Sequence, residues 1–138
     1  GISGCGPTAL SMVYVGLTGD LSMDPYQMGI YTEKNGYAIV NEGSTWDLFQ
    51  RGATDLGLTS EMIYLDDQIF KESLDQGKYI VLNVSPGDFT TGGHFIVVVS
   101  YNDEGYKVHD PNSLINSSKT WTFERLVPQI KAAWALGK

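Results

Sequence analysis

The chain has 138 residues, of which 42% are hydrophobic and 12% aromatic, and its formal net charge is −7. This length is enough for one domain with its own core, and the negative charge disfavours nucleic acid and anionic membranes as partners. No run approaches the roughly 20 apolar residues that a membrane-spanning helix needs. We therefore expect a single domain over residues 1–138. Because the first residue is Gly1 and not methionine, we also expect a fragment or processed product that is truncated at its N-terminus.

The first half of the sequence predicts helices. Pro7 suits a first helical turn because its missing N–H would be unpaired there, and Asp24 is a suitable N-cap. Ser44 and Thr45 can cap a further helix, which Gly57 closes. We expect these helices at Thr8–Val15, Tyr26–Asn35 and Trp46–Asp55.

The second half of the sequence favours strands. Its apolar segments are rich in β-branched and aromatic residues, and the turn-forming segment Asn102–Gly105 predicts an antiparallel hairpin. The expected strands are Met62–Leu65, Tyr79–Val84, His94–Tyr101, Tyr106–Asp110 and Trp121–Phe123. Helices are expected at Asp67–Gln76 and, closing the chain, at Glu124–Ala135. N-terminal helices packed on a mostly antiparallel sheet indicate an α+β fold.

The only cysteine, Cys5, stands between Gly4 and Gly6 at the predicted start of the first helix. It cannot form an internal disulfide, which leaves a buried apolar role, a redox-sensitive thiol or a nucleophile. A helix N-terminus stabilises a thiolate, and the neighbouring glycines let a substrate approach the sulfur closely. The backbone N–H of Cys5 can also face a developing oxyanion. These flanking residues favour a nucleophile over a buried thiol.

A cysteine nucleophile needs a base, and the chain offers His94 and His109. His94 follows Gly92 and Gly93 at the start of an apolar strand, and Asp110 ends the partner strand of the hairpin. If the two residue numbers of each cross-strand pair have an even sum, His94 and Asp110 point to the same face of the sheet. Asp110 can then accept the Nδ1–H of His94. A two-residue loop would reverse this parity, so the sequence permits the pair without requiring it.

Alternation along the strand disfavours the other histidine. His109 is adjacent to Asp110, so we expect it on the opposite face, as a surface or core residue. The same geometry disfavours a zinc site built from Cys5, both histidines and Asp110, and we expect no metal and no cofactor. Asn112 is a second candidate for orienting the ring, although shaping the turn after Pro111 is the role that the sequence favours.

Three segments resemble one known family. They are SGCGPTALSMV near the start, GSTWDLFQRGATDLGL in the middle and GGHFIVVVSYNDEGYKVHDPN in the second half, and together they extend over nearly the whole chain. The GCGPT segment combined with a later GGHF and a D-P step is specific. The sequence resembles bacterial cysteine peptidase family 39, in particular its bacteriocin-processing-like branch, which has a papain-like cysteine proteinase fold.

The resemblance implies that Cys5 is the nucleophile, His94 the general base and acid, and Asp110 the group that orients the ring. The helix start and the strand pattern select the same residues. The family also carries a glutamine a few residues before the cysteine, which completes the oxyanion hole, whereas residues 1–4 here are Gly-Ile-Ser-Gly. Losing one oxyanion donor typically costs about 10²–10³ in rate. The missing glutamine therefore supports the expectation of a truncated chain.

The implied function is that of a cysteine peptidase acting through an acyl-enzyme. Gly4, Gly92 and Gly93 are the expected substrate-binding residues because a substrate strand can lie close to their backbone, a plain loop being the alternative for the last two. Two other functions stay open. One is a catalytically silent papain-like domain that binds a peptide or cell-wall component, and the other is an amidase or transpeptidase acting on peptidoglycan stem peptides. The resemblance implies a secreted or cell-surface bacterial protein, although an acidic chain without disulfides suits a cytoplasm equally.

Overall fold

A computed structural model describes residues 5–37 and 46–138 of the chain, and at Cys5 it describes the backbone alone. The N-terminal part is helical, as the sequence predicts. Its elements are α1, Cys5–Thr18; α2, Pro25–Lys34; and a helical stretch over residues 46–55 that contains the π-helical turn η1, Leu48–Gly52, and α4, Ala53–Asp55. Asp24 caps α2 by accepting the N–H of Gln27 at 2.8 Å. The expected caps Ser44 and Thr45 lie outside the described residues.

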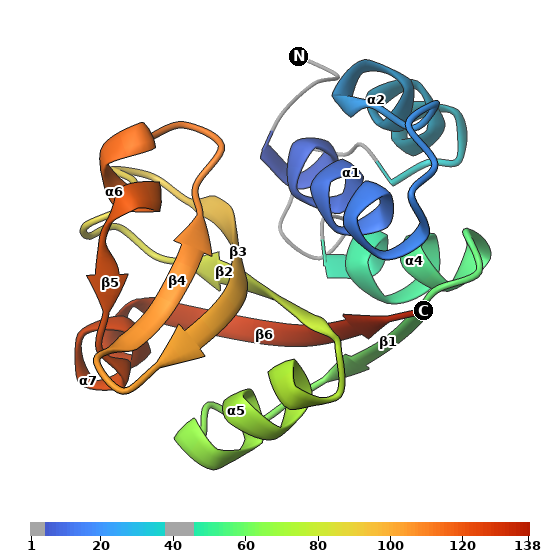
Figure 1. The fold of residues 1–138 in the computed structure, drawn as a ribbon. Helices are drawn as coiled ribbons and strands as arrows, with labels where there is room; N and C mark the ends of the chain where they lie inside the picture. Colours follow the sequence, from blue (N-terminus) through green and yellow to red (C-terminus); the bar gives the residue numbers. More distant parts are fainter. Residues whose placement is uncertain (1–4, 38–45) are drawn as a thin grey trace.

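The rest of the chain builds one six-stranded sheet with the order β1-β6-β2-β3-β4-β5, in which all neighbours are antiparallel. The strands are β1, Thr59–Met62; β2, Tyr79–Val84; β3, His94–Asn102; β4, Gly105–His109; β5, Thr120–Trp121; and β6, Ile130–Gly137. Between them lie α5, Asp67–Asp75; α6, Leu114–Ser118; α7, Phe123–Leu126; and the 3-10 turn η2, Val127–Gln129 (Figure 1). This architecture confirms the predicted α+β class. None of the described helices is both long and apolar enough to cross a membrane.

Different helices cover the two faces of the sheet. Alternate residues of a strand point to opposite faces, so Val81 and Val97 join the cluster that contains α1, whereas Ile80 and Ile96 pack with Phe70 of α5. Figure 1 shows α1, α2 and α4 grouped together on one side of the sheet. The sheet is therefore a buried layer between two apolar clusters.

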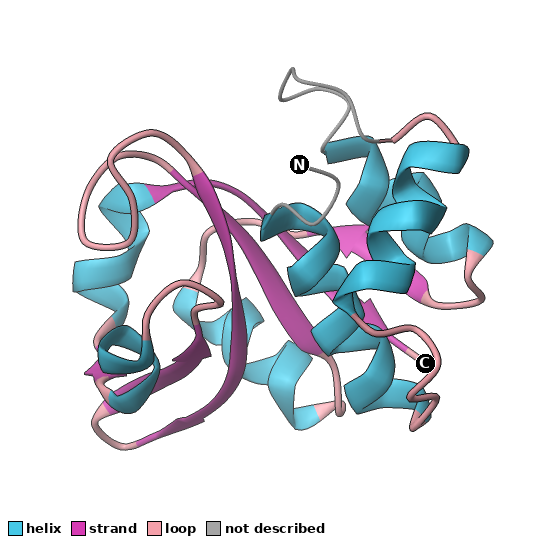
Figure 2. Ribbon diagram, turned by 90° about the horizontal axis from the view of Figure 1, so that it is seen from above, coloured by secondary structure: helices cyan, strands magenta, loops and turns pink. Residues whose placement is uncertain are grey.

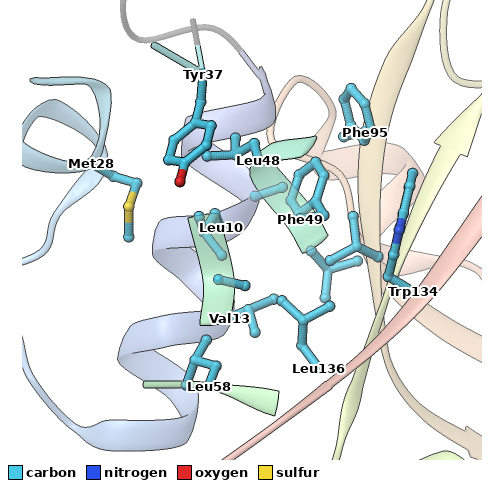
Figure 3. Close-up of a cluster of buried hydrophobic side chains, with 14 of the residues drawn as sticks. Leu10, Val13, Met28, Tyr37, Leu48, Phe49, Leu58, Phe95, Trp134 and Leu136 are labelled. Carbon is cyan, nitrogen blue, oxygen red and sulfur yellow. The ribbon is translucent and has the colours of Figure 1, made fainter. Parts of the chain in front are cut away.

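Aromatic rings pack η1 against β3 and β6, and apolar side chains of α1 pack onto the same cluster. Phe49 lies 4.8 Å from Phe95 and 5.6 Å from Trp134 between ring centroids, and all three are buried. Leu10 and Val13 of α1 face this group (Figure 3). With α1 fixed on β3, its first turn lies toward the end of the sheet at which β3 begins (Figures 1 and 2).

The last segment of the chain differs from the prediction. The expected closing helix Glu124–Ala135 is in fact α7, then η2, then the strand β6. Pro128 lies in the first turn of η2, and the helical part ends at Gln129, after which Ile130 takes an extended backbone. Strand β6 lies between β1 and β2, with Trp134 on the α1 face and Ala133 on the other. A strand covered on both faces is apolar at consecutive positions, and periodicity alone does not distinguish it from a helix.

Smaller differences concern the ends of elements. β1 covers Thr59–Met62, so the expected strand Met62–Leu65 is wrong by three residues. The reason is that pairing with β6 begins earlier, at Thr59 opposite Gly137. Only Trp121 of the expected strand Trp121–Phe123 lies in β5, and Phe123 begins α7. The short helix α6 has no counterpart in the prediction.

Candidate active site

The hairpin of β3 and β4 decides whether His94 and Asp110 share a face of the sheet. At its tip Asn102 pairs with Gly105, which leaves a two-residue loop. Near the tip, the two residue numbers of each cross-strand pair have an odd sum, as in Tyr101 opposite Tyr106. If this register continued along the strands, His94 and Asp110 would lie on opposite faces, which is the outcome that a two-residue loop predicts.

A β-bulge changes the outcome. The register shifts at Val99, which is one extra residue in β3, and beyond it Val98 pairs with Val108. Since every second residue of a strand points the same way, His94 joins the face of Val98, and Asp110 joins the face of Val108. The extra residue therefore restores the parity that the His94–Asp110 pair needs.

His94 and Asp110 form a buried contact on that face. Nε2 of His94 lies 2.7 Å from Oδ1 of Asp110, and each residue is 3% exposed. The sequence-based expectation that Nδ1 makes this bond is wrong. Asp110 is displaced along the hairpin from the position directly opposite His94, so the carboxylate meets the far end of the ring, where Nε2 lies.

Two further donors hold the Asp110 carboxylate. The backbone N–H of Asn112 donates to Oδ1 at 2.9 Å, and Nδ2 of Asn116 donates to Oδ2 at 3.1 Å. The backbone N–H of Asp110 donates to Oγ of Ser117 at 2.8 Å. Asn112 thus takes part through its backbone, in the turn that the sequence predicts after Pro111. The carboxylate reaches the imidazole with the orientation of both its oxygens fixed.

Sequence reasoning missed Asn116 and Ser117 because it missed α6. Ser113 caps this helix by accepting the N–H of Asn116 at 3.0 Å. Serine is a preferred N-cap residue, and its position three residues after Asp110 is the signal that would have predicted a helix start there.

The loop between β2 and β3, residues 85–93, leads directly into His94 and is held at Asp88. Arg125 donates to the Asp88 carboxylate from Nε at 2.6 Å and from Nη2 at 2.7 Å, and Gln129 donates from Nε2 at 2.9 Å. The hydrogen bond from Arg125 is the main cause that lowers the pKa of Asp88. A lowered carboxyl pKa stabilises the folded chain at neutral pH, and this contribution is lost only as the pH falls below the ordinary carboxyl range.

Gly92 and Gly93 are exposed at the end of this loop. The N–H of Gly92 donates to Oγ1 of Thr90 at 3.1 Å, which makes a compact turn before His94. A Cβ added at Gly92 or Gly93 would meet no atom within 4 Å. The space beside both glycines is therefore open.

The remaining site residues are placed only in part. Cys5 begins α1, as the sequence predicts, while its side chain and Gly4 lie outside the described residues. The first turn of α1 and the start of β3 lie at the same end of the sheet (Figures 1 and 2). His109 pairs with Val97, so it points to the face opposite His94. Within residues 5–37 and 46–138, no cluster of three or more His, Cys, Asp or Glu side chains is arranged to hold a metal ion.

Comparisons with known proteins identify similar sequences and similar folds. The model of the Peptidase_C39 like family matches residues 2–136. The peptidase domain of Streptococcus ComA, a bi-functional ABC transporter involved in quorum sensing, is similar in structure with a TM-score of 0.65, at 17% identity over 99% of this chain and 93% of that one. A putative C39-like peptidase from Bacillus anthracis has a TM-score of 0.62, at 18% identity over 99% of this chain and 89% of that one. No curated protein sequence matches the chain. The structural similarities confirm the expected papain-like fold.

Proposed function

The chain belongs to the Peptidase_C39 like family, and on this premise we propose that it is a cysteine peptidase that cleaves peptide bonds with Cys5, His94 and Asp110. The observation that carries the proposal is the buried contact of 2.7 Å between His94 and Asp110. Burying two ionisable side chains is costly unless they are paired and hydrogen-bonded. The β-bulge in β3 brings the two residues to one face, and α6 supplies Asn116, which donates to the Asp110 carboxylate. A general base requires an imidazole that a carboxylate orients in this way.

In the proposed mechanism Asp110 holds His94 through Nε2, and Nδ1 is the nitrogen that exchanges protons. The Cys5 thiolate attacks the substrate carbonyl carbon, forming a C–S bond. The imidazolium then gives its proton to the leaving amine as the C–N bond breaks. In the second half, His94 takes a proton from water, the hydroxyl adds to the acyl carbon, and the C–S bond breaks to release the acid and restore the thiolate.

The start of α1 supports this chemistry. The N-terminus of a helix carries unpaired N–H groups and a partial positive charge, which stabilise a thiolate. In this mechanism the backbone N–H of Cys5, the first residue of α1, donates to the oxyanion of the tetrahedral intermediate. The helix thus serves both the nucleophile and the charge that develops on the substrate.

The family points to peptides as the substrate class, and we infer a secreted or cell-surface peptidase of the bacteriocin-processing type. Incubation with an unfolded protein and with peptidoglycan stem peptides separates peptidase action from amidase or transpeptidase action. We expect new α-amino groups from the unfolded protein. Reaction of the stem peptides alone would assign the site to cell-wall chemistry instead.

We predict that Cys5 reacts rapidly with iodoacetamide in the native chain. An ordinary thiol is about 1% ionised at pH 6.5, so a Cys5 stabilised as a thiolate should alkylate about 10 to 100 times faster than a cysteine in an unstructured peptide. The rate is measured by mass spectrometry between pH 6 and 7. Because the chain has a single cysteine, all the label reports on Cys5.

The same labelling after denaturation supplies the control. In the unfolded chain the rate should fall to that of the peptide. A Cys5 that is inert in the native chain and reacts only after unfolding would contradict the peptidase and favour a silent binding domain.

We predict that Gly92→Ala and Gly93→Ala lower activity without lowering stability. A Cβ at either position meets no atom, so the midpoint of thermal unfolding should stay within about 2 °C. If a substrate strand lies against this backbone, an added methyl group should reduce kcat/KM about tenfold, and valine should reduce it further. Unchanged kcat/KM in the whole series would assign the two glycines to a plain loop.

A further inference from the structure

The amide of Asn116 contacts two parts of the site at once. Its Nδ2 donates to Oδ2 of Asp110 at 3.1 Å and to the backbone carbonyl of Asp88 at 3.2 Å. Building on the proposed function, we propose that Asn116 is a positioning residue, which fixes the direction of the bond between His94 and Asp110 by joining the Asp110 carboxylate to the loop that precedes His94.

The neighbours of Asn116 determine how its amide points. A carboxylate oxygen and a backbone carbonyl only accept hydrogen bonds, so the NH₂ side of the amide must face both. Oδ1 of Asp110 already accepts from His94 and from the backbone of Asn112, and Asn116 holds the other oxygen. A carboxylate bonded at both oxygens cannot rotate about its Cβ–Cγ bond without losing a hydrogen bond. The direction in which Oδ1 meets the ring is therefore set in part by Asn116.

Asn116 is itself held at both ends of its backbone. Its N–H donates to Oγ of Ser113 at 3.0 Å, and its carbonyl accepts from Nε1 of Trp121 at 3.0 Å. Trp121 is 6% exposed and packs against Phe89 with ring centroids 4.5 Å apart. A buried aromatic anchor therefore fixes the helix that presents the amide, and this rigidity is what a positioning residue needs.

The other acceptor, the carbonyl of Asp88, is fixed from the opposite side. Besides the ion pair with Arg125, the N–H of Asp88 donates to Oε1 of Gln129 at 2.7 Å. Asp88 lies in the loop of residues 85–93, which leads into His94. Through Asn116, the chain before the imidazole and the chain after the carboxylate are thus joined by side-chain hydrogen bonds, independently of the strand pairing between them.

The test compares two variants of Asn116. Asn116→Leu keeps the size of the side chain and removes both donated hydrogen bonds, whereas Asn116→Asp keeps its shape and replaces the donor with a carboxylate. Of these two hydrogen bonds, the one to the Asp110 carboxylate has a charged acceptor, and its loss is expected to cost about tenfold in rate. We expect kcat to fall about tenfold in the leucine variant and further in the aspartate variant, with KM changed less than twofold. The same change at Asn35, whose Nδ2 donates to the carbonyl of Tyr31 in α2, is the matched control and should leave kcat unchanged.

A double-mutant cycle shows whether Asn116 acts through Asp110. In an Asp110→Ala background, Asn116→Leu should have no further effect on kcat. Additive effects, or a rise in KM with an unchanged kcat, would overturn the proposal while leaving the peptidase intact. Loss of kcat in the Asn35 variant as well would reduce the effect to general destabilisation and would also overturn it.

A measurement that needs no catalytic activity tests the role of Asn116 independently of the proposed function. In a Cys5→Ala chain, the proton between Nε2 of His94 and Asp110 should give a slowly exchanging ring N–H signal by NMR. We expect Asn116→Leu to accelerate its exchange at least about tenfold, whereas Asn35→Leu should not. If the wild-type chain shows no cysteine-dependent cleavage, the peptidase fails and this signal alone decides the role of Asn116. An unchanged signal would overturn it.

Discussion

Replacing Cys5 with alanine should reduce kcat/KM for peptide cleavage at least about 10⁴-fold, the scale on which nucleophile removal acts in other acyl-transfer enzymes. Without the sulfur no acyl-enzyme forms, and the residual rate comes from substrate binding and the helix N-terminus alone. Progress curves for an unfolded protein substrate, followed by the release of new amino groups, measure the effect.

Folding is the necessary control for this variant. Alanine suits the first turn of a helix, so α1 should persist, and circular dichroism should show an unchanged spectrum and unfolding midpoint. Cleavage that continues at the wild-type rate in Cys5→Ala would refute a mechanism that uses the Cys5 thiol. The silent domain that binds a peptide or cell-wall component would then be the favoured alternative.

The sequence predicts most of the fold because most elements have local signals. Asp24 caps α2 as expected, and the turn at Asn102–Gly105 forms the expected hairpin. Strand β6 could not be identified, because the sheet position that buries both Ala133 and Trp134 is a tertiary property. An apolar segment of this kind has the same local pattern as a buried helix until the neighbouring strands are known.

In the candidate site, too, the sequence predicts the features that have a local signal and not those set by tertiary contacts. His94 and Asp110 could be selected from residue type and strand position, but whether they meet depends on Val99. No local signal in the run of valines says which residue will bulge, since any of them fits a pleated strand. Asn116 was missed for a different reason: its role depends on α6, whose capping serine is visible in the sequence and was not used.

Replacing His94 with glutamine should lower kcat roughly 10³–10⁴-fold, whereas His109→Gln should change it less than twofold. The two histidines lie on adjacent strands of the same hairpin but point to opposite faces. Glutamine is the informative replacement, because an amide can still donate to Oδ1 of Asp110 and so avoids leaving a buried carboxylate without its partner, yet it exchanges no proton. The alkylation rate of Cys5 near pH 6.5 should fall together with kcat in the His94 variant alone.

This pair of variants tests the strand alternation on which the proposal depends. His94 contacts the Asp110 carboxylate, whereas His109 is adjacent to Asp110 and points to the opposite face of the sheet. Equal loss of activity in both variants would mean that the ring acts as part of the hairpin's packing and not as a base. A loss confined to His109 would mean that proton transfer takes place on the face of Val97, which α1 covers, and the buried contact of His94 with Asp110 would then be structural.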